Sequence, residues 1–452
     1  MSWLAHIWRS IFQGPVIPES DRDRKTIVFG HLLLHFRPIR VPARTLQYTH
    51  TFGLGGMSLV LFLLLVGTGV LMLFVYQPAP GGAYESVQAL QHEVLFGDLI
   101  RGMHYWSANL LVVVLLLHLL RVYLTGAYFA PRQFNWIIGL GLLCCALLSN
   151  LTGYLLPWDQ LAYWATTIVT GMISYVPVVG TWLQRIVLGG TEVGSSTLII
   201  FYALHTTVLP VTIVALMAFH FWRIRKARGV VIPRAPEEQI AEKPEYELFL
   251  PNLLMREFAV ALVLIALVMT VALFFGAPLG EAANPGMSTN PAKAPWYFMG
   301  FQELQLHFHP LFGAVLMPLL IVLGLLTIPY LRYDRETSGI LLAGHAGRRL
   351  GLAAVGIGAV AAVIWVLADE WWLDPGTWLP GIPAVLSEGA LPAVILLGLV
   401  LAIHTQFKRR ADFNNESIQA SFLLVLSGFL VLTVIGIWFR GPGMALVWPW
   451  NL

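Results

Sequence analysis

The sequence predicts an all-α polytopic membrane protein with about nine transmembrane helices. Of its 452 residues, 57% are hydrophobic and only 11% are charged, whereas soluble domains carry roughly 25% charged residues. Nine apolar runs are long enough to cross a hydrocarbon core of about 30 Å. They lie near 50–76, 98–124, 134–156, 196–222, 256–276, 311–331, 350–368, 389–407 and 417–438.

Lysine and arginine predict the orientation of these spans. When the connections are assigned alternately to two sides, four of the 27 Lys and Arg residues fall on one side and 23 on the other. The four are Arg101, Arg185, Lys293 and Arg440. Because positive residues are retained on the cytoplasmic side, the N-terminus is predicted to be cytoplasmic. An odd number of spans then places the C-terminus on the opposite, positive side.

Polar connections divide the chain into four parts. Residues 1–48 are predicted to form a cytoplasmic or interfacial segment that begins with the amphipathic stretch MSWLAHIWRSIFQGP, which lacks the features of a signal peptide. Residues 49–228 contain a four-helix unit, and 229–255 form a polar cytoplasmic linker. Residues 256–452 form a C-terminal unit with about five spans.

Two connections on the positive side are too long to be plain turns. The connection 157–195 carries amphipathic patches that predict helices at the membrane interface. The connection 277–310 is rich in Pro and Gly before the string PWYFMGFQELQLHFHP. Both would lie beside anything bound near the outer ends of the second and fourth spans.

Two pairs of histidines lie inside apolar spans. His104 and His118 are fourteen residues apart, and His205 and His220 are fifteen apart. At about 100° and 1.5 Å per residue, each pair keeps within roughly 40–60° of one helix face and about 21–22 Å apart. Two such helices side by side could present His104 with His205 near the positive side, and His118 with His220 near the cytoplasmic side.

This arrangement predicts two stacked haems held by the four-helix unit. A single intramembrane His is often a structural hydrogen-bonding residue, but four at matched long spacings favour metal ligation. Zinc and di-metal sites need ligands close together in sequence, unlike these. Two axial imidazoles suit a low-spin iron for electron transfer. No CxxCH motif occurs, so the haems would be non-covalent b-type haems, and Cys144 and Cys145 are interpreted as packing residues.

Glycines and arginines near these histidines are further candidates for cofactor binding. The glycines are Gly56, Gly69, Gly139 and Gly153, spaced thirteen and fourteen apart on the first and third spans. They could leave room for a flat macrocycle, or simply allow close helix packing. Arg101 and Arg121 bracket the second span, where they could pair with haem propionates or extend along the membrane surface as snorkelling flanks.

Four strings carry a resemblance to a known family: GLGGMSLVLFLLLVGTG, RGMHYWSANLLVVVLLLHLLRVYLTG, LTGYLLPWDQLAYWATTIVTG and GSSTLIIFYALHTTVLP. They resemble cytochrome b of quinol–cytochrome c oxidoreductases, the Rieske/cytochrome b complexes. The N-terminal half is most similar to the chloroplast and cyanobacterial type, here fused with the C-terminal half in one chain. The resemblance is dense over 45–235 and then thins to PWYFMGFQEL, and the last two spans carry no recognisable motif.

The resemblance implies a subunit that oxidises quinol by a Q-cycle in an energy-transducing membrane, such as the bacterial cytoplasmic membrane. Quinol, with menaquinol as one option, would be oxidised near the positive side, between 157–173 and the loop ending at Trp296 and Tyr297. One electron would pass to a Rieske iron–sulfur protein and a c-type cytochrome, and the other through both haems to an inner quinone site, with proton translocation. A homodimeric complex and no nucleic-acid partner are implied.

Residues near the cytoplasmic side are candidates for quinone or proton handling at the inner site. They are His31, His35, Arg223 and Lys226, which could equally be ordinary cytoplasmic anchors.

The sequence departs from the family pattern at three positions. Pro295 replaces the glutamate of the family's quinol-oxidising motif, so Glu303, His307 or His309 is hypothesised to accept the quinol proton instead. A buried carboxylate with a raised pKa could act as that base. Ile200 stands where the family commonly has arginine. Gly53 stands where the chloroplast type attaches a third haem through cysteine, so no covalent third haem is expected.

Two other functions would fit nine apolar spans. A haem-bearing membrane anchor could relay electrons between a soluble dehydrogenase and quinone without bifurcation. A transporter built of nine helices would need no haem. The Trp296–Tyr297 motif favours quinol oxidation, with Trp296, Tyr297 and Glu303 as the candidate catalytic residues.

Overall fold

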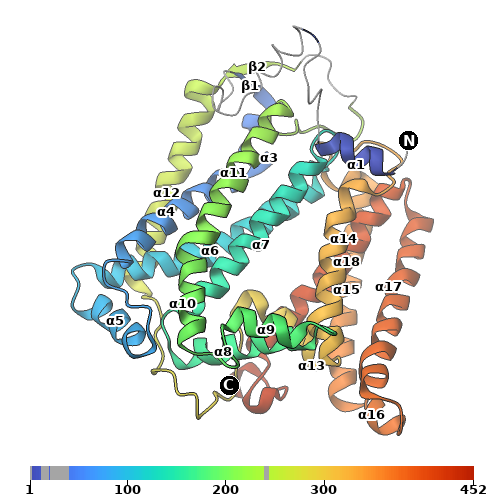
Figure 1. Ribbon diagram of the computed structural model, residues 1–452. Helices are drawn as coiled ribbons and strands as arrows, with labels where there is room; N and C mark the ends of the chain where they lie inside the picture. Colours follow the sequence, from blue (N-terminus) through green and yellow to red (C-terminus); the bar gives the residue numbers. More distant parts are fainter. Residues whose placement is uncertain (1–2, 12–19, 21–39, 239–243, 452) are drawn as a thin grey trace.

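A computed structural model describes residues 3–11, 20, 40–238 and 244–451. Within these residues, nine helical spans are long and apolar enough to cross a membrane. They are α4 (Leu54–Met72), α6 (Gly97–Leu124), α7 (Gln133–Leu155), α10–η3–α11 (Ser195–Lys226), η4–α12 (Phe249–Phe274), η6–α14–η7 (Leu311–Tyr330), α15 (His345–Trp371), η9–α17 (Val385–Arg410) and α18 (Asn414–Trp438). The all-α prediction is therefore confirmed, and Figure 1 shows the two chain ends at opposite ends of the helices.

Shorter elements cover the two ends of the spans. At the end that carries the N-terminus lie α1 (Trp3–Ile11), η1 (Ala43–Leu46), α3 (Tyr48–Thr51) and the strands β1 (Arg40–Pro42) and β2 (Tyr246–Leu248). At the other end lie α5 (Pro80–His92), α8 (Gln160–Met172), η2 (Ile173–Tyr175), α9 (Gly180–Leu188), η5 (Trp296–Phe298), α13 (Met299–Leu306) and α16 (Pro375–Trp378). The predicted interfacial helices of 157–195 are thus α8 and α9.

Three spans contain a π-helical turn just before a proline. The turns are η3 (Leu204–Val208), η6 (Leu311–Leu316) and η9 (Val385–Ala390). Pro210, Pro318 and Pro392 follow each turn by two residues. Proline has no N–H and its ring clashes with the carbonyl four residues earlier, so the preceding turn widens to i→i+5 bonding instead of breaking.

The N-terminal unit is built from two helix pairs, α4 with α6 and α7 with α11. Span α12 also packs against α6 and α4, where Leu264 and Val268 join Leu61 and Leu111 in one buried cluster. The linker at 229–255 predicts that this span belongs to the C-terminal unit. The linker therefore separates two units in sequence, while the packing adds a fifth span to the first unit.

Antiparallel strands β1 and β2 join the start of the N-terminal unit to the end of the linker. Arg40 pairs with Leu248, Val41 with Glu247 and Pro42 with Tyr246. The N-terminal helix α1 makes a second connection, because its Ser10 hydroxyl lies 3.0 Å from the Tyr330 hydroxyl at the end of η7 (Ile328–Tyr330).

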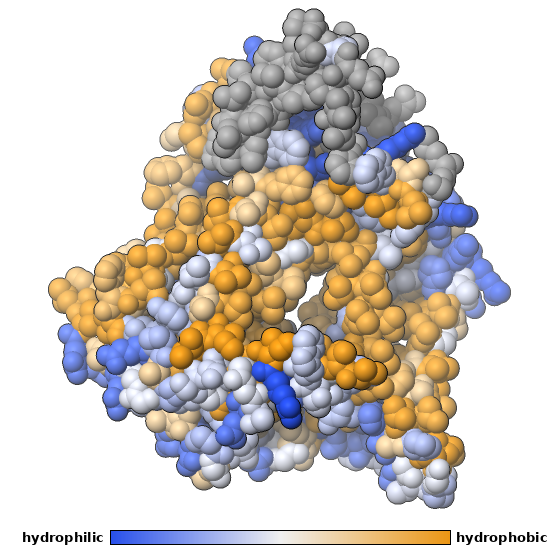
Figure 2. All heavy atoms as spheres, viewed as in Figure 1, coloured by the Kyte–Doolittle hydropathy of each residue, from blue (hydrophilic) through white to orange (hydrophobic). Residues whose placement is uncertain are grey.

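The C-terminal unit is centred on α15 and α18, which pack closely along their lengths, and α17 lies outside them. On the face shown in Figure 2, apolar residues form a belt across both units, with polar residues at the lower end. The same view shows the surface hollowed between α7 and α14, within the apolar belt. The hollow faces the region that would be occupied by lipid.

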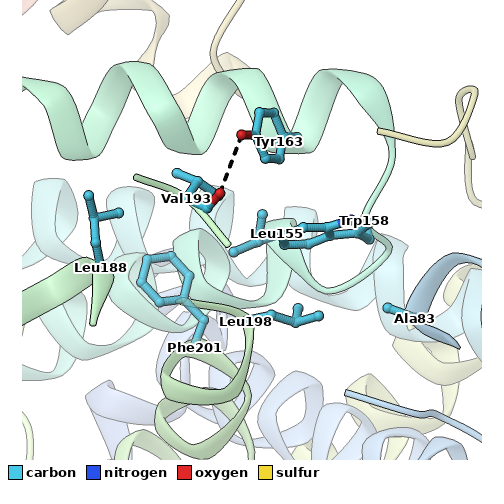
Figure 3. Packing of buried hydrophobic residues seen from close by; sticks show 8 residues of the cluster. All are labelled: Ala83, Leu155, Trp158, Tyr163, Leu188, Val193, Leu198 and Phe201. Atoms are coloured by element: carbon cyan, nitrogen blue, oxygen red, sulfur yellow. Dashed lines mark hydrogen bonds between the residues drawn. The ribbon is translucent and has the colours of Figure 1, made fainter. Parts of the chain in front are cut away.

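A hydrophobic cluster fixes α8 and α9 against the outer ends of α7 and α10 (Figure 3). Its members are Ala83, Leu155, Trp158, Tyr163, Leu188, Val193, Leu198 and Phe201. The Tyr163 hydroxyl donates to the Val193 carbonyl at 3.3 Å. Asp159 also caps α8 by accepting from the Ala162 amide at 2.9 Å, which suits the positive end of a helix.

Candidate functional site: two pairs of facing histidines

The outer histidine pair brings α6 and η3 together. The rings of His104 and His205 lie with their centroids 6.1 Å apart. Two metal–nitrogen bonds of about 2 Å, each with about 1 Å from nitrogen to ring centre, would separate two axial imidazoles by roughly 6 Å. The spacing of the two rings therefore fits a metal ion between them.

Both outer rings are oriented by a hydrogen bond at Nδ1. His104 Nδ1 lies 2.9 Å from the Thr68 hydroxyl, which itself donates to the Leu64 carbonyl at 2.7 Å, so the imidazole N–H is the donor. His205 Nδ1 donates to the Ser149 carbonyl at 2.8 Å. Such bonds fix the tautomer and leave Nε2 as the metal ligand. Neither Thr68 nor Ser149 was predicted from the sequence, since neither carries a motif by itself.

The inner histidine pair lines a cavity. His118 and His220 share its wall with Arg121, Arg132 and Asn135. Arg132 Nε and Asn135 Oδ1 are buried and have no hydrogen-bond partner among the described residues. Cofactor sites are typically lined by apolar residues with a few placed polar groups. The positive charges of Arg121 and Arg132 therefore suit this cavity to a group with acidic substituents.

The π turn explains how unequal histidine spacings give two matching pairs. His205 lies inside η3, so one residue of the fifteen between it and His220 is taken up by the wider turn. The partner helix α6 has fourteen steps and no such turn in its described length. Both helices can therefore present their two imidazoles at matching heights.

Glycines lie beside all four histidines, and three of these glycines are among the four candidates named from the sequence. A Cβ atom on Gly153 would lie 2.5 Å from the His205 ring, on Gly69 3.3 Å from His104 and on Gly139 3.7 Å from His220. The glycine beside His118 is Gly55, whose Cβ would lie 3.6 Å away, whereas Gly56 has nothing within 4 Å. Gly55 and Gly69 are fourteen apart, the same spacing as the third-span pair.

The two arginines predicted to bind haem propionates, Arg101 and Arg121, also form hydrogen bonds with other parts of the chain. Arg101 donates to the Ala277 carbonyl at 2.7 Å and the Pro278 carbonyl at 2.6 Å, which ties α6 to the long outer loop. Arg121 lines the inner cavity and its Nε donates to the His50 carbonyl at 2.8 Å. His50 Nε2 lies 2.8 Å from Arg121 Nη2 and 2.5 Å from the Val231 carbonyl. Burial and the charge of Arg121 lower the pKa of His50 to about 4, so this histidine is neutral at pH 7.

The two long outer connections contact each other. The Asp159 carboxylate accepts from the Gly280 amide at 3.0 Å, and Gln160 Oε1 accepts from the Asn284 amide at 2.6 Å. Trp296 Nε1 donates to Asn109 Oδ1 of α6 at 2.7 Å. The loop that ends at Trp296 and Tyr297 is therefore attached to both α8 and the helix that carries His104.

Tyr297 is suited to donate a hydrogen bond. Its burial, with Tyr154 and Tyr105 as neighbours, raises the pKa of the phenol. The hydroxyl therefore keeps its proton at neutral pH.

Glu303 and His307 belong to a buried ionic cluster at the outer end of the C-terminal unit. Arg440 donates to Glu303 Oε1 at 2.7 Å and, on its other side, to Glu370 Oε2 at 2.8 Å. His307 lies between Glu303 (3.2 Å) and Asp369 (2.7 Å). Asp369 and Glu370 were missed by sequence analysis, although two adjacent acids at the end of a span were a visible signal.

The expected raised pKa of Glu303 is wrong. Burial opposes its ionisation, but hydrogen bonds from His307 and Arg440 and the Arg440 charge hold the pKa of Glu303 below its ordinary value. Burial likewise disfavours charge on His307, yet hydrogen bonds to Asp369 and Glu303 raise its pKa. His309 lies outside this cluster, with its amide donating to the Glu388 carbonyl at 2.9 Å.

The inner-side candidates have mostly structural contacts. Arg223 is buried and donates to the carbonyls of Ser10 and Ile11, the latter at 2.8 Å, so it binds the C-terminal end of α1. The Lys226 amine lies 5.1 Å from the Trp222 ring centroid. His31 and His35 lie outside the described residues. At Gly53, φ is +66°, a left-handed conformation that would strain a cysteine.

The fold and the site define a polytopic helical membrane protein whose facing imidazoles suit bis-histidine haem ligation. A family profile described as cytochrome b/b6/petB matches residues 42–228. Cytochrome b6 of Synechococcus sp. (strain WH7803) is 47% identical over 173 residues, which are 38% of this chain and 79% of that protein. Cytochrome b6 of Acaryochloris marina (strain MBIC 11017) is 47% identical over 173 residues, 38% and 80% of the two chains.

The similarity of fold extends to the C-terminal half. A chain of a hyperthermophilic respiratory Complex III superposes with a TM-score of 0.63 and 22% identity, covering 93% of this chain and 97% of that one. The chain belongs to the cytochrome b/b6 family. Membership confirms the resemblance and implies b-type haem in an integral membrane protein of electron transport.

Proposed function

We propose that this chain is the di-haem cytochrome b subunit of a Rieske/cytochrome b complex that oxidises quinol by a Q-cycle. The observation that carries the proposal is the placement of the outer histidine pair directly beside the attached outer loops. Trp296 and His104 are connected through α6 by the Trp296–Asn109 hydrogen bond. A substrate pocket at this position would deliver electrons next to one end of a path across the membrane.

Each residue set has a role in this proposal. His104 with His205, and His118 with His220, would hold the two b-type haems, with Gly55, Gly69, Gly139 and Gly153 leaving room beside the rings. Haem held there would supply one-electron redox chemistry. Arg121 and Arg132 would bind acidic substituents in the inner cavity, and Arg101 keeps the outer loop in place.

At the outer site, the chain would bind and orient the quinol. The hollow between α7 and α14 within the apolar belt gives an apolar molecule a path from the bilayer. The protonated Tyr297 would donate a hydrogen bond to a quinol oxygen. Partners in the proposal are a Rieske protein and a c-type cytochrome on the positive side, within a homodimeric complex.

Haem reduction by quinol tests the proposal. The complex, purified with its haems, is reduced by a short-chain quinol in the presence of an outer-site blocker, an inner-site blocker or both. Bifurcation predicts that the inner-site blocker increases haem reduction, and that only the two blockers together prevent it. If one blocker alone abolished haem reduction, the chain would be a simple relay between a dehydrogenase and quinone.

The inner haem provides a matched control. His220→Leu should remove one haem while leaving the absorption and the outer-site reduction of the other. A protein that binds no b-type haem would overturn both haem functions.

A further inference from the structure

A chain of hydrogen bonds leads from the interior of the outer loop to the protein surface. Glu303 has no exposed side-chain surface, and its Oε1 lies 3.2 Å from His307 Nε2. His307 Nδ1 lies 2.7 Å from Asp369 Oδ2, and the Asp369 side chain is 26% exposed. Three consecutive ionisable groups therefore connect a dry position to water.

The inner end of this chain follows the quinol motif closely in sequence. Glu303 is in α13 (Met299–Leu306), which begins directly after η5 (Trp296–Phe298). Its neighbour Gln302 accepts from the Ala294 amide and donates to the Ala292 carbonyl, both at 2.7 Å. The motif loop thus folds back onto the helix that carries Glu303, in a chain whose motif has Pro295 in place of a carboxylate.

The ring between the two carboxylates must carry a proton on each nitrogen, because a carboxylate accepts and does not donate hydrogen bonds when ionised. The charges around it come from three elements. Glu303 is on α13, Asp369 and Glu370 are on α15, and Arg440 follows α18. Lys293 is directed elsewhere, to the Ile437 carbonyl at 2.9 Å.

We propose that Glu303, His307 and Asp369 form a proton exit relay from the outer quinol site to the positive face. This inference rests on the proposed function, which supplies two protons and two electrons for each quinol oxidised. One of those protons would use the relay. Glu303 is its transient acceptor, because Arg440 keeps the carboxylate ionised between turnovers and favours rapid transfer to the imidazole.

The proton balance closes over one cycle. The His307 Nδ1 proton moves to Asp369 and then to water, which leaves a neutral ring with hydrogen on Nε2. A proton from the quinol protonates Glu303. The His307 ring then rotates, so that its unprotonated nitrogen faces Glu303. This nitrogen accepts the proton from Glu303, which restores the imidazolium. One proton enters, one leaves, and no residue is oxidised or reduced.

Two neighbouring carboxylates allow a matched test. Asp369→Asn removes the surface end of the relay, while Glu370→Gln removes a similarly exposed carboxylate that pairs with Arg440 and not with His307. Quinol oxidation is measured with the haem-loaded complex, using short-chain benzoquinol and naphthoquinol, across pH and in H₂O and D₂O. Haem content per protein reports folding of each variant.

Asp369→Asn should slow oxidation by about tenfold or more and increase the solvent isotope effect. Glu370→Gln should stay within about twofold of the parent, and Asp369→Glu should recover most of the rate. Equal effects of Asp369→Asn and Glu370→Gln, or an unchanged isotope effect in Asp369→Asn, would overturn the relay alone. Failure of the parent complex to oxidise either quinol would instead overturn the proposed function, and the relay with it.

Discussion

At the scale of single residues, the space beside the histidine rings exists because the neighbouring residues are glycines, which have no side chain. A methyl group on Gly153 would fall 2.5 Å from the His205 ring, closer than any ordinary carbon contact. Gly56 is one position away from the glycine that faces His118 and has open space around it. A side chain at Gly153 would therefore clash with a histidine ring, whereas a side chain at Gly56 would not, although both glycines lie in apolar helices.

Gly153→Ala should consequently displace His205 and lower haem content toward one haem per chain. Gly56→Ala should retain two haems, because alanine only improves helix propensity at an open position. Haem per protein, measured on purified variants, checks both. Loss of haem in Gly56→Ala, or full retention in Gly153→Ala, would contradict this account.

The ion pair of Glu303 and Arg440 should be strongly coupled. Removing one partner of a buried pair costs about 3–5 kcal/mol, so Arg440→Gln should destabilise the outer end of α13 markedly. The double variant Arg440→Gln with Glu303→Gln should recover about 0.5–3 kcal/mol of that loss. Thermal unfolding of the purified protein in detergent measures both, and strictly additive effects would show that the pair does not interact.

Because of the same cluster, the stability of the folded protein should pass through a maximum as pH is varied. The lowered pKa of Glu303 means that its contribution is present above the ordinary carboxyl value of 4.5 and is lost as pH falls. The raised pKa of His307 means the reverse: its contribution is present below 6.5 and is lost as pH rises through the raised value. Melting temperature followed from about pH 2 to about pH 9 should show both limbs. His307→Gln should remove the alkaline limb.

At the scale of elements, the π turn η3 is an inserted residue that the helix accommodates. Deleting Thr207 should convert the turn to α-helix and leave His205 and His220 fourteen residues apart. Two haems should then be retained. Deleting Val113 from α6, where no π turn is available to absorb the change, should rotate His104 by about 100° relative to His118 and lose a haem. Haem spectra of the two deletions would distinguish these outcomes.

The elements also show how much the sequence could predict. Hydropathy located all nine described spans, and the spacing of four histidines located the site, because both depend on local pattern. Gly56 was chosen over Gly55 because spacing alone cannot resolve one residue of helix rotation. The π turn was missed because the effect of Pro210 depends on the surrounding helices. Glu303 was correctly suspected to be buried, but its pKa depends on Arg440, 137 residues away.

At the scale of the whole molecule, the described ends of the chain lie on opposite faces of the bundle. The distribution of Lys and Arg predicts that the C-terminal face is the positive side. Alkaline phosphatase, which is active only outside the cytoplasm, should therefore be active when fused after Trp450 and inactive when fused after Ala227. The opposite pattern would reverse the orientation and place the Glu303 cluster on the cytoplasmic side.

The β1–β2 ribbon has a consequence for how such chains can be encoded. Residues 40–42 and 246–248 are hydrogen-bonded across the linker, and α12 packs on the first unit. The two halves therefore recognise each other without the peptide connection between them. A gene divided within the linker would still yield two polypeptides able to assemble, so fission and fusion of this protein can be nearly neutral events in evolution.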